Sequence, residues 1–310
     1  LENELQQLAK AKENLIKHTR ILRLSADERT QLFILYAESN ELTKVKLLKT
    51  REEGGSTSSC EEQKQAAYKQ AKADYALVDY RFHVNNFYED KETLKPYSVK
   101  QDGGINWEYS PKDASDEYQK QLHRHQWFIP QAKAYRVSGD EKYIQSWIEA
   151  YGSWIETFPY TPGTVFPPAG GSENDVDYQW KGLQVAERVL SQVDIMPYFI
   201  HSTNFTPEWL STFLVAFEKE VECIRLNYYQ SGNILISQYQ AVATAGILMP
   251  EFKNASTWAT EGTQGLNESL DTQFNDDGVE YELDFSYHTA AISDFREIYL
   301  IAQANNKTNL

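Results

Sequence analysis

Helical periodicity is the feature that most constrains what this chain can fold into. Apolar residues recur every three or four positions through most of its 310 residues, with turn signals between the periodic stretches. The spacing predicts helices over residues 1–23, 26–52, 61–78, 115–137, 140–158, 180–199 and 232–248, and further helices that begin at Pro207, Pro250 and Ser286. Strand-like alternation is limited to one short stretch at 279–283. The chain is therefore predicted to be all-α.

Local turn and capping signals separate these helices. Residues 54–59 are rich in Gly and Ser, and residues 159–177 are rich in Pro and Gly, so both stretches are predicted loops. Thr206, followed by Pro207 and an acid, is typical of a helix N-terminus. The helix that follows is predicted to bury one face, formed by Trp209, Phe213, Phe217, Val221 and Ile224.

Two further patterns bear on architecture. Residues 81–110 are rich in aromatic side chains but have no helical period, so we expect an irregular excursion over the surface of the domain. Many antiparallel helix pairs of about 20 residues, joined by short loops, favour an α/α toroid or a solenoid. The absence of a fixed repeat period disfavours a standard helical repeat array. We expect N-terminal helices and the irregular stretch at 1–110, and one continuous helical domain at 111–310.

Charge and length of apolar runs exclude some classes of function. The net charge of −15 argues against nucleic acid as a partner, although a groove can be locally basic. No run approaches the roughly 18 apolar residues that a membrane span requires. Residues 1–16 carry charges throughout, so we expect any secretion signal to have been removed or left out of this sequence.

Aromatic residues and cysteines leave alternatives open. Aromatic side chains make up 13% of the chain, which fits either a core filled with large rings or a carbohydrate cleft in which rings stack on sugars. Cys60 and Cys223 are too few for a disulfide framework or a convincing zinc site, and a single bridge between them stays open.

Three segments carry polar groups that a plain helix does not need. The first, at 122–128, reads LHRHQWF, and its alternative interpretation is a polar helix face with a satisfied histidine. In the second, Asn233 follows Gly232 at a helix start, where it could be only an N-cap. In the third, at 277–288, Tyr287 and His288 meet at a helix start, and the tyrosine could be a packing residue.

Together these segments resemble the heparinase II/III type of polysaccharide lyase, most closely the heparinase III branch. The matching text, in order along residues 75–300, includes Ile105-Asn106-Trp107, QLHRHQW at 121–127, KAYRVSGDEKY at 133–143, Gly232-Asn233, Pro250-Glu251-Phe252, and Asp277-Gly278 through YHTAAI at 287–292. The resemblance implies an incomplete (α/α) toroid of antiparallel helix pairs, normally followed by an antiparallel β-sandwich domain that is absent here.

The activity implied by the resemblance is β-elimination at a uronic acid. A proton alpha to a carboxylate is very weakly acidic, so an enzyme must neutralise that carboxylate. By resemblance, Asn233 is the neutralising residue and Tyr287 is the acid that protonates the leaving glycosidic oxygen. The family's base is a histidine from the β-sandwich side. We therefore expect the base beyond Leu310 and an incomplete enzyme in a chain that ends there.

Further residues are candidates for binding the acidic sugar. A guanidinium pairs bidentately with carboxylate or sulfate, an ammonium acts as a point charge, and aromatic rings stack on sugar faces. The alternative for each basic residue is a surface ion pair. The predicted substrate-binding residues are Arg124, His125, Gln126, Trp127, Trp180, Lys181, Arg188 and His288. No metal ligand set and no cofactor is predicted.

The sequence departs from the family pattern beside Asn233. Ile234 stands where the family usually has a histidine, so one hydrogen-bond donor to the carboxylate is missing. Gln238 stands where close relatives carry an acid, and the two changes could compensate each other. The leading prediction is a bacterial lyase, secreted or periplasmic and monomeric, that cleaves heparan sulfate or a similar glycosaminoglycan. The alternatives are a lyase for hyaluronan, chondroitin or alginate, and a non-catalytic glycan-binding toroid.

Overall fold

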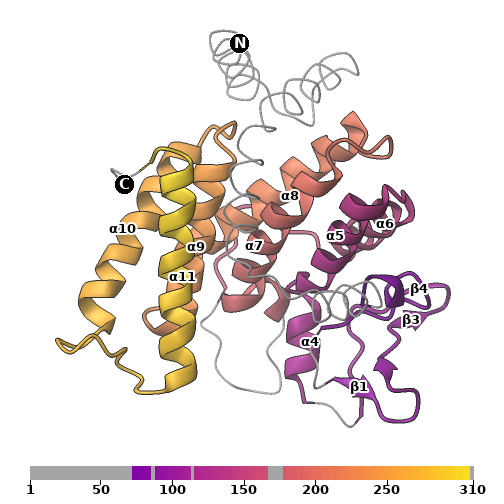
Figure 1. Cartoon of the computed structure of the whole chain (residues 1–310), viewed down its shortest axis with the longest axis horizontal. Helices are drawn as coiled ribbons and strands as arrows, with labels where there is room; N and C mark the ends of the chain where they lie inside the picture. The colour runs from indigo at the N-terminus through magenta and orange to yellow at the C-terminus, as the bar shows by residue number, and fades with distance from the viewer. Residues whose placement is uncertain (1–71, 85–87, 113–114, 167–176, 308–310) are drawn as a thin grey trace. The chain divides into compact units, whose positions relative to one another are not determined.

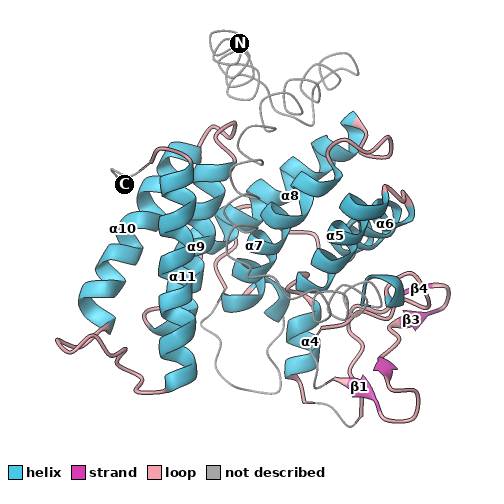
Figure 2. Cartoon of the chain, in the orientation of Figure 1, coloured by secondary structure: helices cyan, strands magenta, loops and turns pink. Residues whose placement is uncertain are grey.

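Helices dominate the computed structural model, which describes residues 72–84, 88–112, 115–166 and 177–307 (Figures 1 and 2). The predicted all-α class is confirmed. The helices predicted at 1–23 and 26–52, most of the one predicted at 61–78, and the loop predicted at 54–59 lie outside the described residues.

Short strands occur only where the sequence loses its helical period, as far as the described residues go. Strand β1 (Glu89–Asp90) pairs antiparallel with β2 (Lys95–Pro96), and β3 (Lys100–Gln101) pairs antiparallel with β4 (Gly104–Ile105). The described part of 81–110 is irregular, as predicted, but it is not only a surface excursion, because Phe82, Tyr97 and Trp107 are buried. The short strand predicted at 279–283 is wrong: only Glu280 makes an isolated bridge, to Phe274, and turns surround it.

Two compact units make up the chain. Of the described residues, 162–166, 177–190 and 210–307 form the α9–α11 unit, and 72–84, 88–112, 115–161 and 191–209 form the α4–α6 unit. Helices α7 (Gly182–Phe199) and α8 (Pro207–Leu226) contribute residues to both. Thr206 Oγ1 accepts the backbone N–H of Trp209 at 3.2 Å, which confirms the predicted cap, and all five residues of the predicted apolar face are buried. The domain boundary proposed at residue 110 stays a prediction.

The α4–α6 unit corrects one predicted helix. Residues 115–137 form α4 (Glu117–Leu122), the 3₁₀ turn η2 (Gln126–Phe128) and α5 (Ile129–Ser138) instead of one helix. His125 adopts a left-handed conformation with φ of 60°. Pro130 is the physical reason, because a proline has no N–H to donate and is tolerated only in the first turn of a helix. As predicted, α5 stops at Ser138, with Gly139 in the left-handed conformation behind it.

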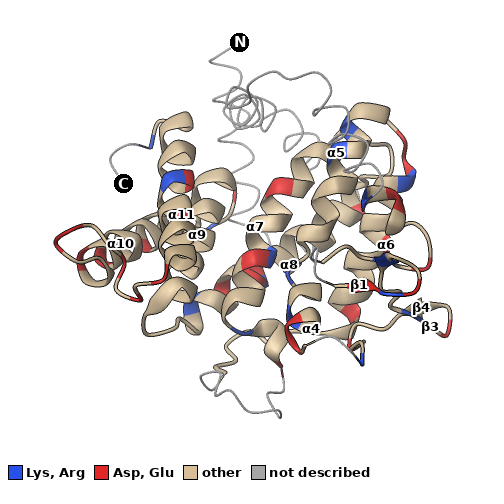
Figure 3. Cartoon of the chain, turned by 60° about the horizontal axis from the view of Figure 1, so that its bottom comes forward, with Lys and Arg blue, Asp and Glu red and all other residues tan. Residues whose placement is uncertain are grey.

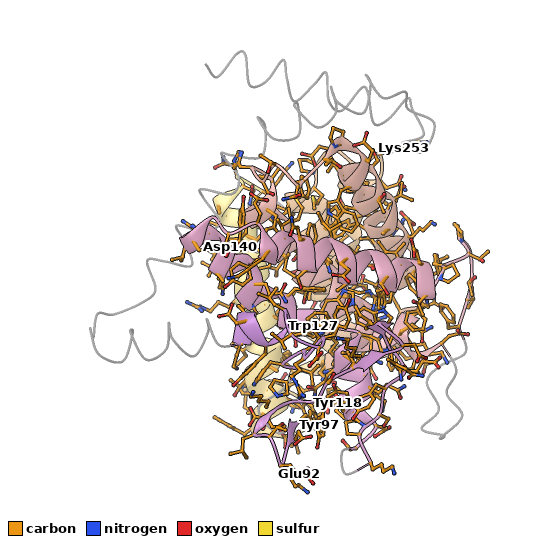
Figure 4. The ribbon with its side chains drawn as sticks, turned by 90° about the vertical axis from the view of Figure 1, so that its right-hand side faces the viewer. Glu92, Tyr97, Tyr118, Trp127, Asp140 and Lys253 are labelled. Atoms are coloured by element: carbon orange, nitrogen blue, oxygen red, sulfur yellow. The ribbon has the colours of Figure 1, made fainter. Side chains whose placement is uncertain are left out.

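Aromatic rings fill the core of this unit (Figure 4). Trp127 stacks on Phe82 with ring centroids 3.6 Å apart, and Tyr118 meets Tyr97 edge to face at 5.7 Å. On α6 (Lys142–Thr157), Trp147 is fully buried. For these rings the core explanation of the aromatic content holds.

Three helices form the described centre of the α9–α11 unit (Figure 1): α9 (Gly232–Leu248), α10 (Ala255–Gln273) and α11 (Phe285–Ala304). Helix α9 has the predicted bounds, and α11 begins one residue before the predicted Ser286. Helix α10 begins five residues later than predicted, because residues 250–253 form turns and Asn254 occupies the N-cap position.

The packing of these helices fixes their directions. Gly246 of α9 lies against Ala259 of α10, and Gly262 of α10 lies against Ala243 of α9, so the two helices are antiparallel. Ser237 of α9 donates to Asp294 of α11 at 3.2 Å, and one turn further on Gln240 reaches Glu297. Helices α9 and α11 therefore run parallel, with their N-terminal ends on the same side.

Candidate active site

The N-terminus of α9 presents Asn233. Ser231 occupies the N-cap position, so the alternative that Asn233 is merely the cap is wrong. Gly232 has φ of +86°, and its N–H donates to Gln273 Oε1 at 2.7 Å. Among the described residues, no side-chain group accepts from or donates to the Asn233 carboxamide, which is partly exposed. The amide is therefore available to an incoming group.

The segment between α10 and α11 crosses this helix end. Glu282 Oε1 accepts the backbone N–H of Asn233 at 3.4 Å. A side chain at Gly232 would come within 3.3 Å of Glu282 Oε1 and 3.6 Å of the Tyr281 hydroxyl. The positive φ favours glycine at 232, and a side chain there would also press on the Glu282 carboxylate.

Tyr287 lies in the first turn of α11. Asp284 caps the helix, because its Oδ1 accepts the backbone N–H groups of Ser286 at 2.8 Å and Tyr287 at 3.1 Å. The Tyr287 side chain is 45% exposed, and its hydroxyl makes no hydrogen bond with the described residues. The packing alternative does not describe this position, and the phenol is accessible.

His288 and Glu280 support the same region. His288 Nδ1 accepts the backbone N–H of Glu280 at 3.3 Å, so in the neutral imidazole the hydrogen lies on Nε2. Burial raises the pKa of the Glu280 carboxyl, and the charge of Glu282 adds to the rise, whereas the backbone N–H of Glu282 lowers it. Asn233, Tyr287 and His288 are the predicted residues that the structure gathers at one end of the α9–α11 pair.

The surroundings of this end are acidic. Residues 276–284 include Asp276, Asp277, Glu280, Glu282 and Asp284 and no Lys or Arg (Figure 3). A carboxylate that enters here meets no basic side chain from this segment. Favourable charge comes instead from the N-terminal ends of two parallel helices and from neutral amide and hydroxyl donors.

Ile234 and Gln238 do not compensate each other at a shared position. Gln238 is fully buried: its Oε1 accepts the N–H of Tyr229 at 2.8 Å, and its Nε2 donates to the carbonyl of Asn227 at 3.0 Å. The side chain therefore clamps the loop that leads into Asn233. Ile234 is partly exposed in the first turn of α9 and offers no donor.

The predicted residues at 124–127 belong to the α4–α6 unit. His125 is fully buried, with Nδ1 3.0 Å from Nε2 of Gln192, and Trp127 is buried and donates to the carbonyl of Leu122 at 3.0 Å. Both fill the core, whereas the alternative for this segment was a polar helix face with a satisfied histidine. Gln126 is exposed, and Arg124 pairs with Glu117 at 2.7 Å. Their contacts with substrate stay predictions.

Trp180, Lys181 and Arg188 are also buried, in the α9–α11 unit. Arg188 Nε lies 2.9 Å from Glu220 Oε1, its Nη1 donates to the carbonyl of Gln179 at 3.0 Å, and its guanidinium lies over the Trp180 ring. The alternative for Arg188 was an ion pair at the surface. Arg188 does form an ion pair, with Glu220, but the pair is buried. Cys223 is a buried free cysteine whose thiol donates to the Trp180 carbonyl, and Cys60 lies outside the described residues.

Sequence reasoning missed several residues of the site. Asp284 had a local signal, since an Asp three positions before Tyr287 is a typical N-cap. Gln273, Glu282 and Asp294 had none, because their roles arise only from helix packing. No sequence pattern marks Asp294. In the structure its carboxylate accepts a hydrogen bond from Ser237, which lies one turn along α9 from Asn233.

The described ranges contain neither a metal-ligand cluster nor a membrane-spanning helix. Within them, no group of three or more His, Cys, Asp or Glu residues is placed to hold a metal ion. None of the helices in those ranges is both long and apolar enough to cross a bilayer.

Comparison with known families decides the ancestry of the chain. The family described as Heparinase II/III N-terminus matches residues 6–310. The chain belongs to this family. The match covers both units and every predicted site residue, so the family resemblance that rested on short motifs is confirmed.

Named relatives of this family member are bacterial. A heparin-sulfate lyase of Bacteroides thetaiotaomicron is 62% identical over 237 residues, which are 76% of this chain and 32% of that protein. A heparin-sulfate lyase of Bacteroides stercoris is 39% identical over 206 residues, covering 64% of this chain and 31% of that protein. The chain thus spans about a third of the length of the curated relatives it matches.

Solved heparinase III structures share the fold of this family member. One crystal structure of heparinase III aligns with a TM-score of 0.71 and 53% identity, over 93% of this chain and 43% of that one. The heparan sulfate lyase HepC from Pedobacter heparinus aligns with a TM-score of 0.67 and 27% identity, over 96% of this chain and 45% of that one. These neighbours agree with the predicted helical toroid.

Proposed function

We propose that this chain supplies the neutraliser and the acid of a lyase that cleaves heparan sulfate, or a similar uronic-acid glycosaminoglycan, by β-elimination. One observation carries the proposal. The Asn233 carboxamide and the Tyr287 hydroxyl are both accessible, neither is engaged by the described residues, and both lie in first turns at the same end of two parallel helices. The proposal is also supported by the chain's membership of the Heparinase II/III N-terminus family and by relatives named heparin-sulfate lyase.

Asn233 acts on the uronate carboxylate. Its N–H donors reach the carboxylate oxygens and stabilise the charge that spreads onto them when the C5 proton leaves. The partial positive charge at the α9 N-terminus acts in the same direction. Because Glu282 already occupies the backbone N–H of Asn233, the side-chain amide is the donor that remains.

Tyr287 gives its proton to the glycosidic oxygen as the C4–O bond breaks and the C4=C5 double bond forms. The Asp284 cap holds the first turn of α11 and so fixes the phenol in place. The base that takes the C5 proton is assigned, by family resemblance alone, to a histidine outside residues 1–310. No described residue is given that role.

Two rival functions remain alongside this one. Ile234 removes a donor that the family pattern supplies, which favours a different uronate polymer, such as hyaluronan, chondroitin or alginate. The second rival is a glycan-binding toroid without catalysis, which a chain that lacks the family's donor at position 234 would also fit.

A panel of polymers separates these functions. The full-length protein that contains this chain is mixed in turn with heparan sulfate, hyaluronan, chondroitin sulfate and alginate, and absorbance of the conjugated uronate is followed. We expect a rise with heparan sulfate. A rise with another polymer alone would reassign the substrate, and no rise with any polymer would favour the non-catalytic function.

The cellular location of the protein is also proposed from the family resemblance. We propose that the protein is secreted or periplasmic in a bacterial host, where a large anionic polymer is accessible. Activity recovered in the cytoplasmic fraction alone, after osmotic shock, would contradict this.

A further inference from the structure

A cavity of about 540 Å³ lies beside α10, and none of its lining residues belongs to the candidate active site. Tyr228 and Tyr239 form one wall, and the outer face of α10 forms the other with Thr260, Glu261, Gln264 and Glu268. The volume falls in the range of roughly 300–1,000 Å³ typical of small-molecule sites. The cavity is thus large enough for a monosaccharide.

The aromatic wall is held in place from behind. The rings of Tyr228 and Tyr239 have centroids 4.6 Å apart and an angle of 39° between their planes. Gly265 lies directly under Tyr239, where a Cβ would overlap the ring. The Tyr228 hydroxyl donates to Glu261 Oε1 at 2.9 Å. Tyr228 and Gly265 pack against the faces of the Tyr239 ring, so fixed ring edges form this wall of the cavity.

The charge of the cavity is one-sided. Its lining holds two carboxylates and neither Lys nor Arg. Arg225, outside the lining, pairs with Glu261 at 2.7 Å, whereas the Glu268 carboxylate makes no ion pair or hydrogen bond with the described residues. Burial raises the pKa of Tyr239, and the charges of Glu268 and Glu261 raise it further, so the field at the ring is negative. Sulfate and carboxylate groups are repelled from such a cavity, and a cation is attracted.

The rim supplies neutral hydrogen-bonding groups. Ser256, Thr260 and Gln264 follow one another at four-residue spacing along α10 and line the cavity together. Hydroxyl and amide groups of this kind both donate to and accept from ring hydroxyls. We propose that the cavity binds an amino sugar, a hydroxylated ring that carries a protonated primary amine, with the amine at Glu268 and the ring hydroxyls at Ser256, Thr260 and Gln264.

Titration with matched small ligands tests this proposal without reference to the lyase activity. The full-length protein is titrated at about pH 6, where a primary amine of this class is protonated, with glucosamine, N-acetylglucosamine, n-butylammonium and glucuronate. We expect glucosamine to bind about tenfold more tightly than N-acetylglucosamine or n-butylammonium, and glucuronate not to bind. Equal affinity for glucosamine and either of those two, or no binding of glucosamine, would overturn the proposal.

Variants locate the binding. Glu268 is exposed, so Glu268→Gln keeps the fold and should weaken glucosamine binding about tenfold. Asp271→Asn removes the same charge from an exposed position one turn further along α10, outside the cavity, and should leave affinity unchanged. Tyr239→Leu should abolish binding. Equal weakening by Glu268→Gln and Asp271→Asn would show that bulk charge, and not this cavity, attracts the ligand.

Discussion

At the scale of the residue, Gln238 holds the loop that precedes the candidate site. Its carbonyl oxygen accepts from Tyr229 and its amide nitrogen donates to Asn227, and the side chain is fully buried between them. Only an amide can do both, because a carboxylate has no hydrogen to donate. The residue that sequence comparison marks as a departure from an acid is therefore fitted to its surroundings.

Gln238→Glu tests this fit. The carboxylate would face the carbonyl oxygen of Asn227 inside the protein, so the free energy of unfolding should fall by about 1–3 kcal/mol. Urea denaturation followed by circular dichroism measures the change. The same substitution at exposed Gln303 on α11 is the control and should have little effect. Equal stability of the Gln238 variant and its control would contradict the clamp.

Asp294 is a second residue whose surroundings set its chemistry. Burial raises its pKa from 3.8 to about 7, the charges of Glu187 on α7 and Glu297 on its own helix raise it as well, and the hydrogen bond from Ser237 on α9 lowers it. Between about pH 4 and pH 7 the folded chain therefore binds this proton more tightly than the unfolded chain. Its contribution to stability is present at low pH and is lost as pH rises through this window.

Asp294→Asn should remove that pH dependence. At about pH 8 the variant is expected to be more stable than the wild type by about 1–4 kcal/mol, and the difference should shrink towards pH 4. Thermal unfolding over a pH series measures this, with Asp271→Asn as an exposed control. A stability difference that does not change with pH would show that Asp294 keeps an ordinary pKa.

The sequence identifies residues well where local position decides exposure. Asn233 and Tyr287 each follow a helix start, and both are accessible as predicted for a site. It does not identify which polar residues become internal. Arg188 is buried because Glu220, on another helix, neutralises it, and no pattern near residue 188 reports that partner.

At the scale of the element, α9 and α10 pack unusually closely. A Cβ built on Gly262 would stand 2.7 Å from the carbonyl oxygen of Tyr239 and 2.8 Å from Cα of Ala243. Backbone atoms cannot move aside as a flexible side chain can. Gly262 of α10 and Gly246 of α9 let the two helix backbones approach closely. This approach positions Tyr239 and the start of α9.

Gly262→Ala should push the two helices apart. We expect a loss of about 1–3 kcal/mol in the free energy of unfolding, from overpacking. Gly152→Ala on α6 is the matched control, because its nearest neighbour is a Trp209 ring atom at 3.7 Å, an ordinary contact. Since alanine is the better helix former, the control should gain about 0.5–1 kcal/mol in chemical denaturation. A neutral Gly262→Ala variant would contradict the close packing.

Helix ends can be predicted from the sequence where nearby residues determine them, and not where distant contacts do. The start of α8 at Pro207, the stop of α5 before Gly139 and the bounds of α9 were all predicted from capping residues and glycines. The helix predicted over 115–137 failed because Pro130 breaks it and His125 turns the chain in the left-handed conformation. Gln192 and the rings of Tyr151 and Trp154, which contact His125, all lie 26 or more residues further along the chain.

At the scale of the whole molecule, the part of the chain that holds the candidate site has few basic residues to attract an acidic polysaccharide. From residue 227 to residue 295 the only Lys or Arg is Lys253, although this stretch contains Asn233 and Tyr287. Under the proposed function, recognition of a uronate here would depend on amide and hydroxyl donors and on helix ends rather than on salt bridges. The chain also spans about a third of its curated relatives, so the complete reaction is tested in the longer protein.

Replacement of the proposed acid tests the central claim most directly. In the full-length protein, Tyr287→Phe should abolish the absorbance rise with heparan sulfate, while binding of the polymer, measured separately by calorimetry, stays within about twofold. Tyr299→Phe, at another exposed position on α11, should keep both activity and binding. Full turnover by Tyr287→Phe would show that Tyr287 is not the acid and that the end of the α9–α11 pair is not the active site.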